Sequence, residues 1–359
     1  MSPPLLSICI PTFSRAQRLG VMLDALCPQV VAVGDQVELC ISDNASPDET
    51  SQVISSAAET CPIRRHRQPE NVGVIRNIAH LAWEMARGDW VWMLGDDDLL
   101  RPGALGRVVE TLRDNQNLDA ILLNFEFARF EDQWPNRAPG GYTGPRWEPG
   151  ADLGCHRLTR WEDALDAGCG LGTPMYMHVV RRALWQGYAE NGRLGEPFES
   201  PRWTFPHTFM IADAMFGRPS YFVGDPVLVI FNGGQSWLSE VPWVWMEALP
   251  GVLSHLRQLG LPQPRARKLA RWTDEQIEWV LLDHLQGRCR NPRVSVARFL
   301  RTRWREAEAW RIVARASWRF LDGAVKVRLE RRWPAALTAV RRIRGRPPRP
   351  APATGGDSR

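Results

Sequence analysis

Short apolar, β-branched runs alternate with amphipathic segments over the first 130 residues of the chain. The runs recur roughly every 20 to 30 residues, which is the spacing of strands and crossover helices in a parallel α/β sheet. The predicted strands are Leu5–Ile10, Val37–Ser42, Ile63–Arg67, Trp90–Leu94 and Ala120–Phe127. The predicted helices are Ala16–Cys27, Pro47–Thr60, Val74–Arg87 and Pro102–Asn115.

Two of these helices carry start signals. The run Ser46-Pro47-Asp48-Glu49 has the residues of a capping box, with proline at the first helical position. Arg101-Pro102 places a second proline in the same way. We therefore expect these helices to begin at Pro47 and Pro102.

The pattern changes after residue 130. Glu131–Gly172 is rich in Gly, Pro and Trp and is predicted to be a long loop, with a second loop at Gly187–Pro206. Further strands are predicted at Met175–Val180 and Tyr221–Ile230, and a helix at Thr208–Phe216. We expect a catalytic domain over residues 1–240, a helical extension over 241–344 and a disordered Pro/Gly/Arg tail over 345–359.

The composition indicates a folded globular protein, with 44% hydrophobic and 24% charged residues. The seven cysteines are scattered and form no Cys-x-x-Cys pair, which favours a reducing compartment over a disulfide framework or a zinc ribbon. The N-terminus lacks a basic region before its short apolar run, and no stretch reaches the ~18 apolar residues of a membrane span. These features predict a cytoplasmic protein.

The net charge of +5 is unevenly distributed. Residues 261–349 hold 23 Arg or Lys and 8 Asp or Glu, a surplus of +15 that leaves −10 for the rest of the chain. Such a basic region could bind nucleic acid, an anionic membrane or a phosphorylated substrate, and net charge does not choose among them.

Several nucleotide-binding and hydrolytic motifs are missing from the sequence. No Gly-x-Gly-x-x-Gly turn follows the first strand, and neither of the two lysines belongs to a Walker A loop. His-Glu-x-x-His and Gly-x-Ser-x-Gly are absent as well. The common dehydrogenase, NTPase, zincin and α/β-hydrolase classes are thereby excluded.

Three consecutive carboxylates, Asp96, Asp97 and Asp98, follow the apolar strand that begins at Trp90. Adjacent anions repel one another unless a cation or solvent absorbs their charge. At the carboxyl end of a parallel strand, a hard divalent metal held by one or two carboxylates and substrate phosphates would do so. A solvated turn before the next helix is the alternative.

Other polar residues follow the neighbouring strands. Pro11-Thr12 ends the first strand, Asp43 ends the second, and Asn71-x-Gly73 with Arg76 opens the third helix. Taken singly, Asn, Asp and Gly are ordinary turn formers. If the strands are parallel, all of these residues lie at one edge of the sheet, and that co-location indicates a ligand site.

With these motifs the chain resembles the family 2 glycosyltransferases. The resemblance rests on the segments Ser7–Arg15, Ile41–Asp48, Asn71–Asn77 and Asp96–Asp98, and it is strong over residues 5–125 and weak to about 240. It implies a GT-A-like, Rossmann-type α/β fold with a mostly parallel sheet, here followed by the basic helical extension. Within the family, the chain is most similar to bacterial O-antigen and surface-polysaccharide transferases, including abequosyltransferase-like enzymes.

The resemblance implies roles for the motif residues. Pro11, Thr12 and Arg15 would line the nucleotide pocket, and Asp43 would accept a hydrogen bond from the base. The donor would also be bound by Asn71, Gly73 and Arg76. The cationic side chain of Arg76 is suited to binding the diphosphate. Asp96 and Asp97 would contact the ribose and sugar, and Asp98, with Asp96, would ligate Mg²⁺ or Mn²⁺.

Transfer with inversion needs a general base near the acceptor hydroxyl. Family members commonly place a Glu-Asp pair before a helix in the second half of the domain, and no such pair occurs between residues 187 and 217. His207 stands at the expected place, with Glu199 upstream. His207 is the first candidate and Glu199 the second, and His207 as a helix cap is the alternative.

The basic end contains a candidate amphipathic helix. Small or apolar residues recur there at helical spacing, while Arg311, Arg315 and Arg319 project elsewhere. A basic helix with tryptophans at its edge suits a membrane interface, although a helix packed on the catalytic domain would show the same pattern.

We therefore expect metal-assisted sugar transfer from a nucleotide-sugar donor to a glycan or lipid-linked acceptor in surface-polysaccharide synthesis. The enzyme would lie in the cytoplasm or peripherally on the inner face of the membrane, without a nucleic-acid partner. Two alternatives remain open: a nucleotidyltransferase, and a non-catalytic protein whose basic C-terminus binds nucleic acid.

Overall fold

The computed structural model describes residues 3–129, 155–166, 169–232, 237–289 and 291–321. The chain divides into two compact units, Met1–Gly234 and Gln235–Arg359, which are taken separately below. The predicted tail and most of the predicted loop after residue 130 lie outside the described residues. None of the described helices is long and apolar enough to cross a bilayer.

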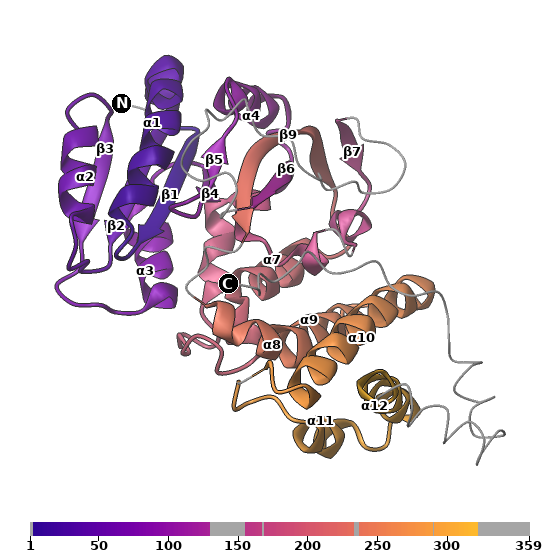
Figure 1. Ribbon diagram of the computed structural model, residues 1–359. Coiled ribbons are helices and arrows are strands. Elements are labelled where there is room, and N and C mark those ends of the chain that lie inside the picture. Colours follow the sequence, from indigo (N-terminus) through magenta and orange to yellow (C-terminus); the bar gives the residue numbers. More distant parts are fainter. Residues whose placement is uncertain (1–2, 130–154, 167–168, 233–236, 290, 322–359) are drawn as a thin grey trace, which may run out of the picture. The chain divides into compact units, whose positions relative to one another are not determined.

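The N-terminal unit is built on one mixed β-sheet (Figure 1). Its strands are β1 (Leu6–Thr12), β2 (Val37–Asp43), β3 (Ile63–Arg67), β4 (Trp90–Met93), β5 (Leu99–Leu100), β6 (Ala120–Arg129), β7 (His156–Leu158), β8 (His178–Arg181) and β9 (Ser220–Asn232). The order across the sheet is β3-β2-β1-β4-β8-β6-β9-β5, and β7 pairs with β9. β1 to β4 are mutually parallel, which confirms the predicted α/β class.

The second half of the sheet departs from the parallel pattern. β8 lies between β4 and β6 and is antiparallel to both, while β6 and β9 are parallel to each other. The predicted strand from Met175 begins three residues late, because Met175–Met177 form a 3₁₀ turn. The sheet is therefore parallel where the motif-bearing strands lie and mixed beyond them.

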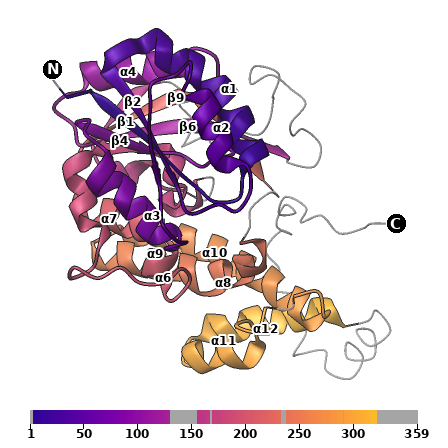
Figure 2. The ribbon, with the colours of Figure 1, turned by 90° about the vertical axis from the view of Figure 1, so that its left-hand side faces the viewer.

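Helices cover both faces of the sheet (Figure 2). The helices of this unit are α1 (Ala16–Val33), α2 (Thr50–Ala57), α3 (Val74–His80), α4 (Ala104–Asp114), α6 (Pro201–Thr204) and α7 (Pro206–Met215). α1, α2 and α4 pack on one face, and α3 packs on the other, where a π turn (Leu81–Met85) extends it. Tryptophans 90 and 92 of β4 are fully buried, so the middle of the sheet forms the core.

Two predicted helix starts are wrong. α2 begins at Thr50 rather than Pro47, because the Ser46 hydroxyl accepts a hydrogen bond from Ser14 instead of capping the helix. The N-cap residue is Glu49, and the Asp48 carboxylate before it accepts from the Thr50 amide at 3.2 Å. α4 begins after Gly103, whose positive φ of 71° breaks the helix that Pro102 was expected to start.

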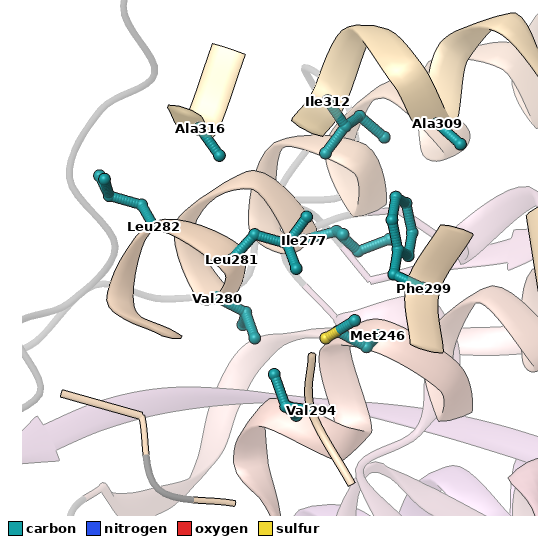
Figure 3. Packing of buried hydrophobic residues seen from close by; sticks show 10 residues of the cluster. All are labelled: Met246, Ile277, Val280, Leu281, Leu282, Val294, Phe299, Ala309, Ile312 and Ala316. Atoms are coloured by element: carbon teal, nitrogen blue, oxygen red, sulfur yellow. The ribbon is translucent and has the colours of Figure 1, made fainter. Parts of the chain in front are cut away.

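The C-terminal unit is helical. It contains α8 (Val241–Trp243), a π turn (Val244–Ala248), α9 (Leu249–Gln258), α10 (Gln263–Leu285), α11 (Val296–Arg303) and α12 (Ala307–Phe320). Figure 3 shows its core, in which Ile277 and Leu281 of α10 lie among Phe299 of α11 and Ile312 and Ala316 of α12.

The predicted outward arginine face of α12 is wrong for two of its three residues. Arg315 and Arg319 both form ion pairs with Glu278 of α10, at 2.6 Å and 3.0 Å. Glu278 is only 3% exposed, so its charge requires these partners. Of the three arginines, Arg311 is the one that is mostly exposed.

Candidate active site

The carboxyl ends of β1, β2 and β4 meet at one edge of the sheet. Thr12 pairs with Asp43 across the parallel β1–β2 ladder, and the Asn44 amide donates to the Thr12 carbonyl at 2.9 Å. The amide after β4, that of Leu94, donates to the Cys9 carbonyl at 2.9 Å. The turn Gly95–Asp98 therefore emerges beside the end of β1.

Each carboxylate of the triplet is held by a different part of the chain. The Thr12 hydroxyl donates to Asp96 Oδ2 at 2.8 Å, and both groups are buried. Burial and then the neighbouring charge of Asp97 raise the pKa of Asp96 to about 7, although Arg15 and the Thr12 hydrogen bond lower it. The family resemblance implies that Thr12 and Asp96 both lie in the donor pocket. The structure joins the two side chains by this hydrogen bond.

Asp97 faces two arginines from the start of α1. Arg15 and Arg18 lie 3.7 Å and 3.3 Å from its Oδ2 atom. Arg18 is absent from the residues expected from the motifs. Its spacing of three residues from Arg15 could have indicated that both arginines serve the same site, because residues three apart lie on the same helix face.

Asp98 is the most enclosed of the three carboxylates. It is 4% exposed, and its Oδ2 atom accepts a hydrogen bond from the Gly95 amide at 2.8 Å. A Cβ at Gly95 would lie 2.9 Å from the same oxygen, so the turn requires glycine. Burial, followed by the charges of Asp97 and Asp96, raises the pKa of Asp98 well above its usual range.

The donor set of this turn fits a hard divalent cation. Carboxylate oxygens are the ligands that Mg²⁺ and Mn²⁺ prefer, and a cation would relieve the repulsion that raises the pKa of Asp96 and Asp98. Within the described residues, no three His, Cys, Asp or Glu side chains converge on a common point. The protein would therefore supply one or two carboxylates, leaving the remaining positions to phosphate oxygens and water.

Asp43 is buried at the end of β2 in a dense hydrogen-bond network. Its Oδ1 atom accepts from the Ser46 amide at 2.9 Å, and its Oδ2 atom accepts from the Ser51 hydroxyl at 2.5 Å and from Arg67 at 2.6 Å. Burial raises the pKa of Asp43, but these bonds and the Arg67 charge outweigh it and lower the pKa overall. Arg67, at the end of β3, carries no motif and was missed by the sequence reasoning.

The turn before α3 is tied to the end of β2. Asn44 donates to the Asn71 side-chain oxygen at 2.8 Å and accepts from the Val72 amide at 2.9 Å. Gly73, with φ of 82°, then precedes the helix. Arg76 is exposed on α3 and forms an ion pair with Glu196 at 2.8 Å, so it would have to exchange this partner to reach a diphosphate.

Pro11 and Thr12 differ in exposure although they are adjacent. Pro11 is half-buried on β1, opposite Ser42 in the ladder, while Thr12 is buried at the end of the strand. Beyond them, the Ser14 amide donates to the Ser46 hydroxyl at 2.9 Å. The loops after β1 and β2 are therefore joined into one wall of the site.

His207 lies in the first turn of α7 and is buried. Its Nε2 atom and the Thr173 carbonyl are 2.7 Å apart, so Nε2 carries the proton in this contact and Nδ1 is the basic nitrogen. Burial lowers the pKa of His207 to about 4, against a smaller opposing effect of the Thr173 bond, and the ring is neutral near pH 7.

The segment that His207 contacts leads back to the carboxylate turn. Three residues after Thr173, the Tyr176 carbonyl accepts from the Trp92 indole of β4 at 2.8 Å. Burial and then the charge of Asp98 raise the pKa of Tyr176 well above its usual range. The segment Thr173–Tyr176 therefore contacts both His207 and Trp92 of β4.

Glu199 lies on an exposed turn before α6. Its carboxylate accepts from Arg193 at 3.2 Å and from the Glu196 amide at 3.1 Å, and its side chain is 43% exposed. Glu196 is also the partner of Arg76, so this turn contacts the N-terminus of α3. His207 thus contacts the segment before β8, and Glu199 lies on a turn that contacts α3.

Residues 7–171 match the family described as Glycosyl transferase family 2. This part of the chain is similar to that family. The matched region includes the ends of β1, β2 and β4 with their carboxylates, and it stops before α7, so the match does not reach His207 or Glu199.

Curated relatives share this region. Abequosyltransferase RfbV of Salmonella typhimurium is 36% identical over 114 residues, which is 31% of this chain and 33% of that protein. Chondroitin synthase of Escherichia coli is 25% identical over 142 residues, 40% of this chain and 20% of that protein. The chain thus matches a third or less of the length of these two relatives.

The fold likeness extends further than the sequence likeness. The structure of Staphylococcus aureus TarS 1–349 in complex with UDP-GlcNAc covers 88% of this chain and 80% of that one, with a TM-score of 0.52 and 13% identity. At this identity the likeness concerns the fold alone, and it confirms the predicted GT-A class.

Proposed function

We propose that this protein transfers a sugar from a nucleotide-sugar donor to a glycan or lipid-linked acceptor in surface-polysaccharide synthesis, with inversion and with a divalent metal. The observation that carries the proposal is the carboxylate turn. Asp96, Asp97 and Asp98 are fixed by β1, by α1 and by their own turn, respectively. Three anions held together in a buried turn are costly unless a cationic ligand binds there.

The donor would lie along the carboxyl edge of the sheet. Asp43, held in place by Ser46, Ser51 and Arg67, would accept a hydrogen bond from the nucleobase through the lone pair left on Oδ1. Pro11, Thr12 and Arg15 would line the nucleotide pocket. This arrangement keeps the base-binding carboxylate rigid before the donor arrives.

The phosphates would lie between the carboxylate turn and α3. Asp98, with Asp96, would hold Mg²⁺ or Mn²⁺, which when bound supplies Lewis-acid stabilisation of charge on the departing diphosphate. Asn71 and Gly73 would contribute polar and backbone groups, and Arg76 would turn from Glu196 toward the diphosphate. Asp97, paired with two arginines, would orient the ribose and sugar.

The acceptor hydroxyl needs a base on the opposite side of the donor sugar. His207 is neutral near pH 7 and has Nδ1 available as its basic nitrogen, and it remains our first candidate. A base with a pKa near 4 would accept the proton late in the reaction, after the forming bond to the donor sugar has made the acceptor hydroxyl more acidic. Glu199 is the second candidate.

The decisive experiment combines ligand-induced stabilisation with product analysis. A ligand that binds only the folded state raises the melting temperature, so a panel of nucleotide-sugars with and without Mn²⁺ should identify the donor. Asp98→Ala should abolish the metal-dependent shift, whereas Asp225→Ala, which changes an exposed carboxylate on β9, should leave it intact. Unchanged turnover by folded Asp98→Ala protein would refute the proposal.

The reaction products separate sugar transfer from nucleotidyl transfer. Release of a nucleoside diphosphate supports the proposed reaction, because the bond broken is the one between the sugar and the diphosphate. Release of pyrophosphate would identify a nucleotidyltransferase instead. A glycan or lipid-linked acceptor is then assayed by incorporation of labelled sugar.

A further inference from the structure

The two sides of α12 have opposite character within the C-terminal unit. On one side, Ala309, Ile312 and Ala316 are fully buried against α10 (Figure 3). On the other side, the exposed positions include Trp310 and Arg311. Burial of apolar side chains explains the residue types on the inner side. Among the described residues, such burial does not explain the residue types on the outer side.

Two exposed tryptophans lie together at the junction of α11 and α12. Trp304 and Trp310 are 56% and 53% exposed, and the Trp310 indole N–H donates to the Trp304 carbonyl at 2.8 Å. This bond fixes one indole beside the other residue's backbone. Because indoles are large and largely apolar, exposing both to water is unfavourable and indicates a binding surface.

Three exposed arginines surround this pair. The Arg305 guanidinium lies 4.9 Å from the ring centre of Trp304, Arg301 lies one helical turn earlier, and Arg311 follows Trp310. All three are exposed, and Arg311 also forms an ion pair with Glu308 at 2.9 Å. Arg315 and Arg319 are instead partly buried and pair with Glu278. We call the five residues Arg301, Trp304, Arg305, Trp310 and Arg311 the Trp304–Trp310 patch.

We propose that the Trp304–Trp310 patch docks the protein on the surface of an anionic lipid bilayer. Indole rings favour the membrane–water interface, where the apolar ring is buried and the polar edge stays near water. The arginines match the negative charge of anionic headgroups, and the surrounding segment 261–349 carries a surplus of +15. Apolar insertion and charge attraction would act together, because interfacial binding strengthens with the buried apolar area and with attraction to anionic lipids.

The local charges favour a bilayer over two other partners, a second copy of the chain and a nucleic-acid strand. A two-fold contact with a second copy would bring the three arginines of each patch against those of the other. A nucleic-acid strand needs a continuous cationic track, whereas this stretch of the chain also holds the carboxylates of Glu306 and Glu308, which pair with Arg303 and Arg311. Lipid headgroups move laterally, so they can gather at the arginines and leave the carboxylates in water.

The first test measures binding of the full-length chain to vesicles of phosphatidylcholine with and without phosphatidylglycerol. Binding is expected only with phosphatidylglycerol and should weaken as salt is added. Trp304→Ser/Trp310→Ser should reduce vesicle binding at least tenfold. Both side chains are more than half exposed, so the melting temperature should change little.

A charge variant with a matched control tests the electrostatic part independently. Arg301→Gln/Arg305→Gln/Arg311→Gln removes three cations from the patch, and Arg267→Gln/Lys268→Gln/Arg271→Gln removes three exposed cations from α10. Each cation near the surface contributes about 1 kcal/mol, or about a factor of five. The patch variant should therefore bind anionic vesicles on the order of 100-fold more weakly, or by a smaller factor if its cations lie farther out. The control should bind much more tightly than the patch variant.

The inference concerns binding alone and does not depend on the proposed sugar transfer. Equal weakening by both triple variants would overturn it, because net charge rather than the patch would then be responsible. Vesicle binding unchanged in the tryptophan variant would overturn it as well. The inference would also be overturned if the only effect of the patch variants were loss of a concentration-dependent dimer or loss of single-stranded RNA binding.

Discussion

The hydroxyl of Thr12 donates a hydrogen bond of 2.8 Å to the carboxylate of Asp96, which lies 84 residues further along the chain. The bond joins the end of β1 to the turn after β4, and both partners are buried. It links two motifs that the sequence shows separately. The four predictions below start from this contact and from others like it.

Thr12→Val should weaken donor binding. The substitution keeps the shape of the side chain but removes the donor, so Asp96 loses a hydrogen bond that lowers its pKa. A hydrogen bond to a charged group contributes about 1.5–3 kcal/mol, which corresponds to roughly a tenfold or greater rise in the donor KM. Thr12→Ser, which retains the hydroxyl, should stay near the wild-type value. Equal effects of Val and Ser would contradict the assigned role of the bond.

Arg18→Gln should have a smaller effect on the same parameter. The side chains of Arg18 and Asp97 are about one-fifth exposed, and Arg15 remains near Asp97 at 3.7 Å. Loss of such a pair costs about 0.5–1 kcal/mol, or a two- to fivefold rise in the donor KM at low salt. The double variant Arg15→Gln/Arg18→Gln should exceed the product of the single effects, because either arginine can compensate for the other. Steady-state kinetics over a range of salt concentrations measure this coupling.

His207→Ala should lower kcat by about 100-fold or more while leaving donor affinity nearly unchanged, which is the usual scale for loss of a general base. Glu199→Ala should have the smaller effect. His207→Gln serves as the control, because a glutamine amide can still donate to the Thr173 carbonyl but cannot act as a base. High turnover in the Gln variant would make His207 a positioning residue, and a larger effect at Glu199 would make Glu199 the base.

Glu278→Gln should destabilise the C-terminal unit. The substitution removes the buried charge that pairs with Arg315 and Arg319 between α10 and α12. Breaking a buried ion pair by removing one partner costs about 3 kcal/mol, and the partial exposure of the two arginines makes this an upper value. Urea unfolding measures the loss. Glu275→Gln, at an exposed position on the same helix, should be nearly neutral.

The hydrophobic pattern predicts the strands better than the capping and proline signals predict the helix starts, although α1 and α3 begin at the predicted Ala16 and Val74. The predicted strand Ile63–Arg67 coincides with β3, and the predicted starts of the strands at Val37, Trp90 and Ala120 are those of β2, β4 and β6. A strand is specified by the apolar residues that it buries. A helix start depends on which side chain accepts a hydrogen bond from the first amides of the helix. The Ser46 hydroxyl instead accepts a hydrogen bond from the Ser14 amide. This contact joins two loops that are distant in the sequence, so a local pattern does not predict it.

The placement of β8 also lies beyond the sequence pattern. The apolar residues of His178–Arg181 indicate a strand but not its direction. Antiparallel insertion between β4 and β6 brings Trp92 of β4 to the Tyr176 carbonyl, just before β8. This pairing sets the segment that connects the carboxylate turn to His207.

The sequence by itself determined the α/β class, the starts of β2, β3, β4 and β6, and the residue types at the edge of the sheet, because hydrophobic periodicity and turn-forming residues act locally. Only the tertiary structure decided which side chains hold one another: Thr12 with Asp96, Arg18 with Asp97, Arg67 with Asp43, and Glu278 with Arg315 and Arg319. These contacts depend on how strands and helices pack across long separations. Buried charges require partners, and chain packing alone selects which partners are within reach.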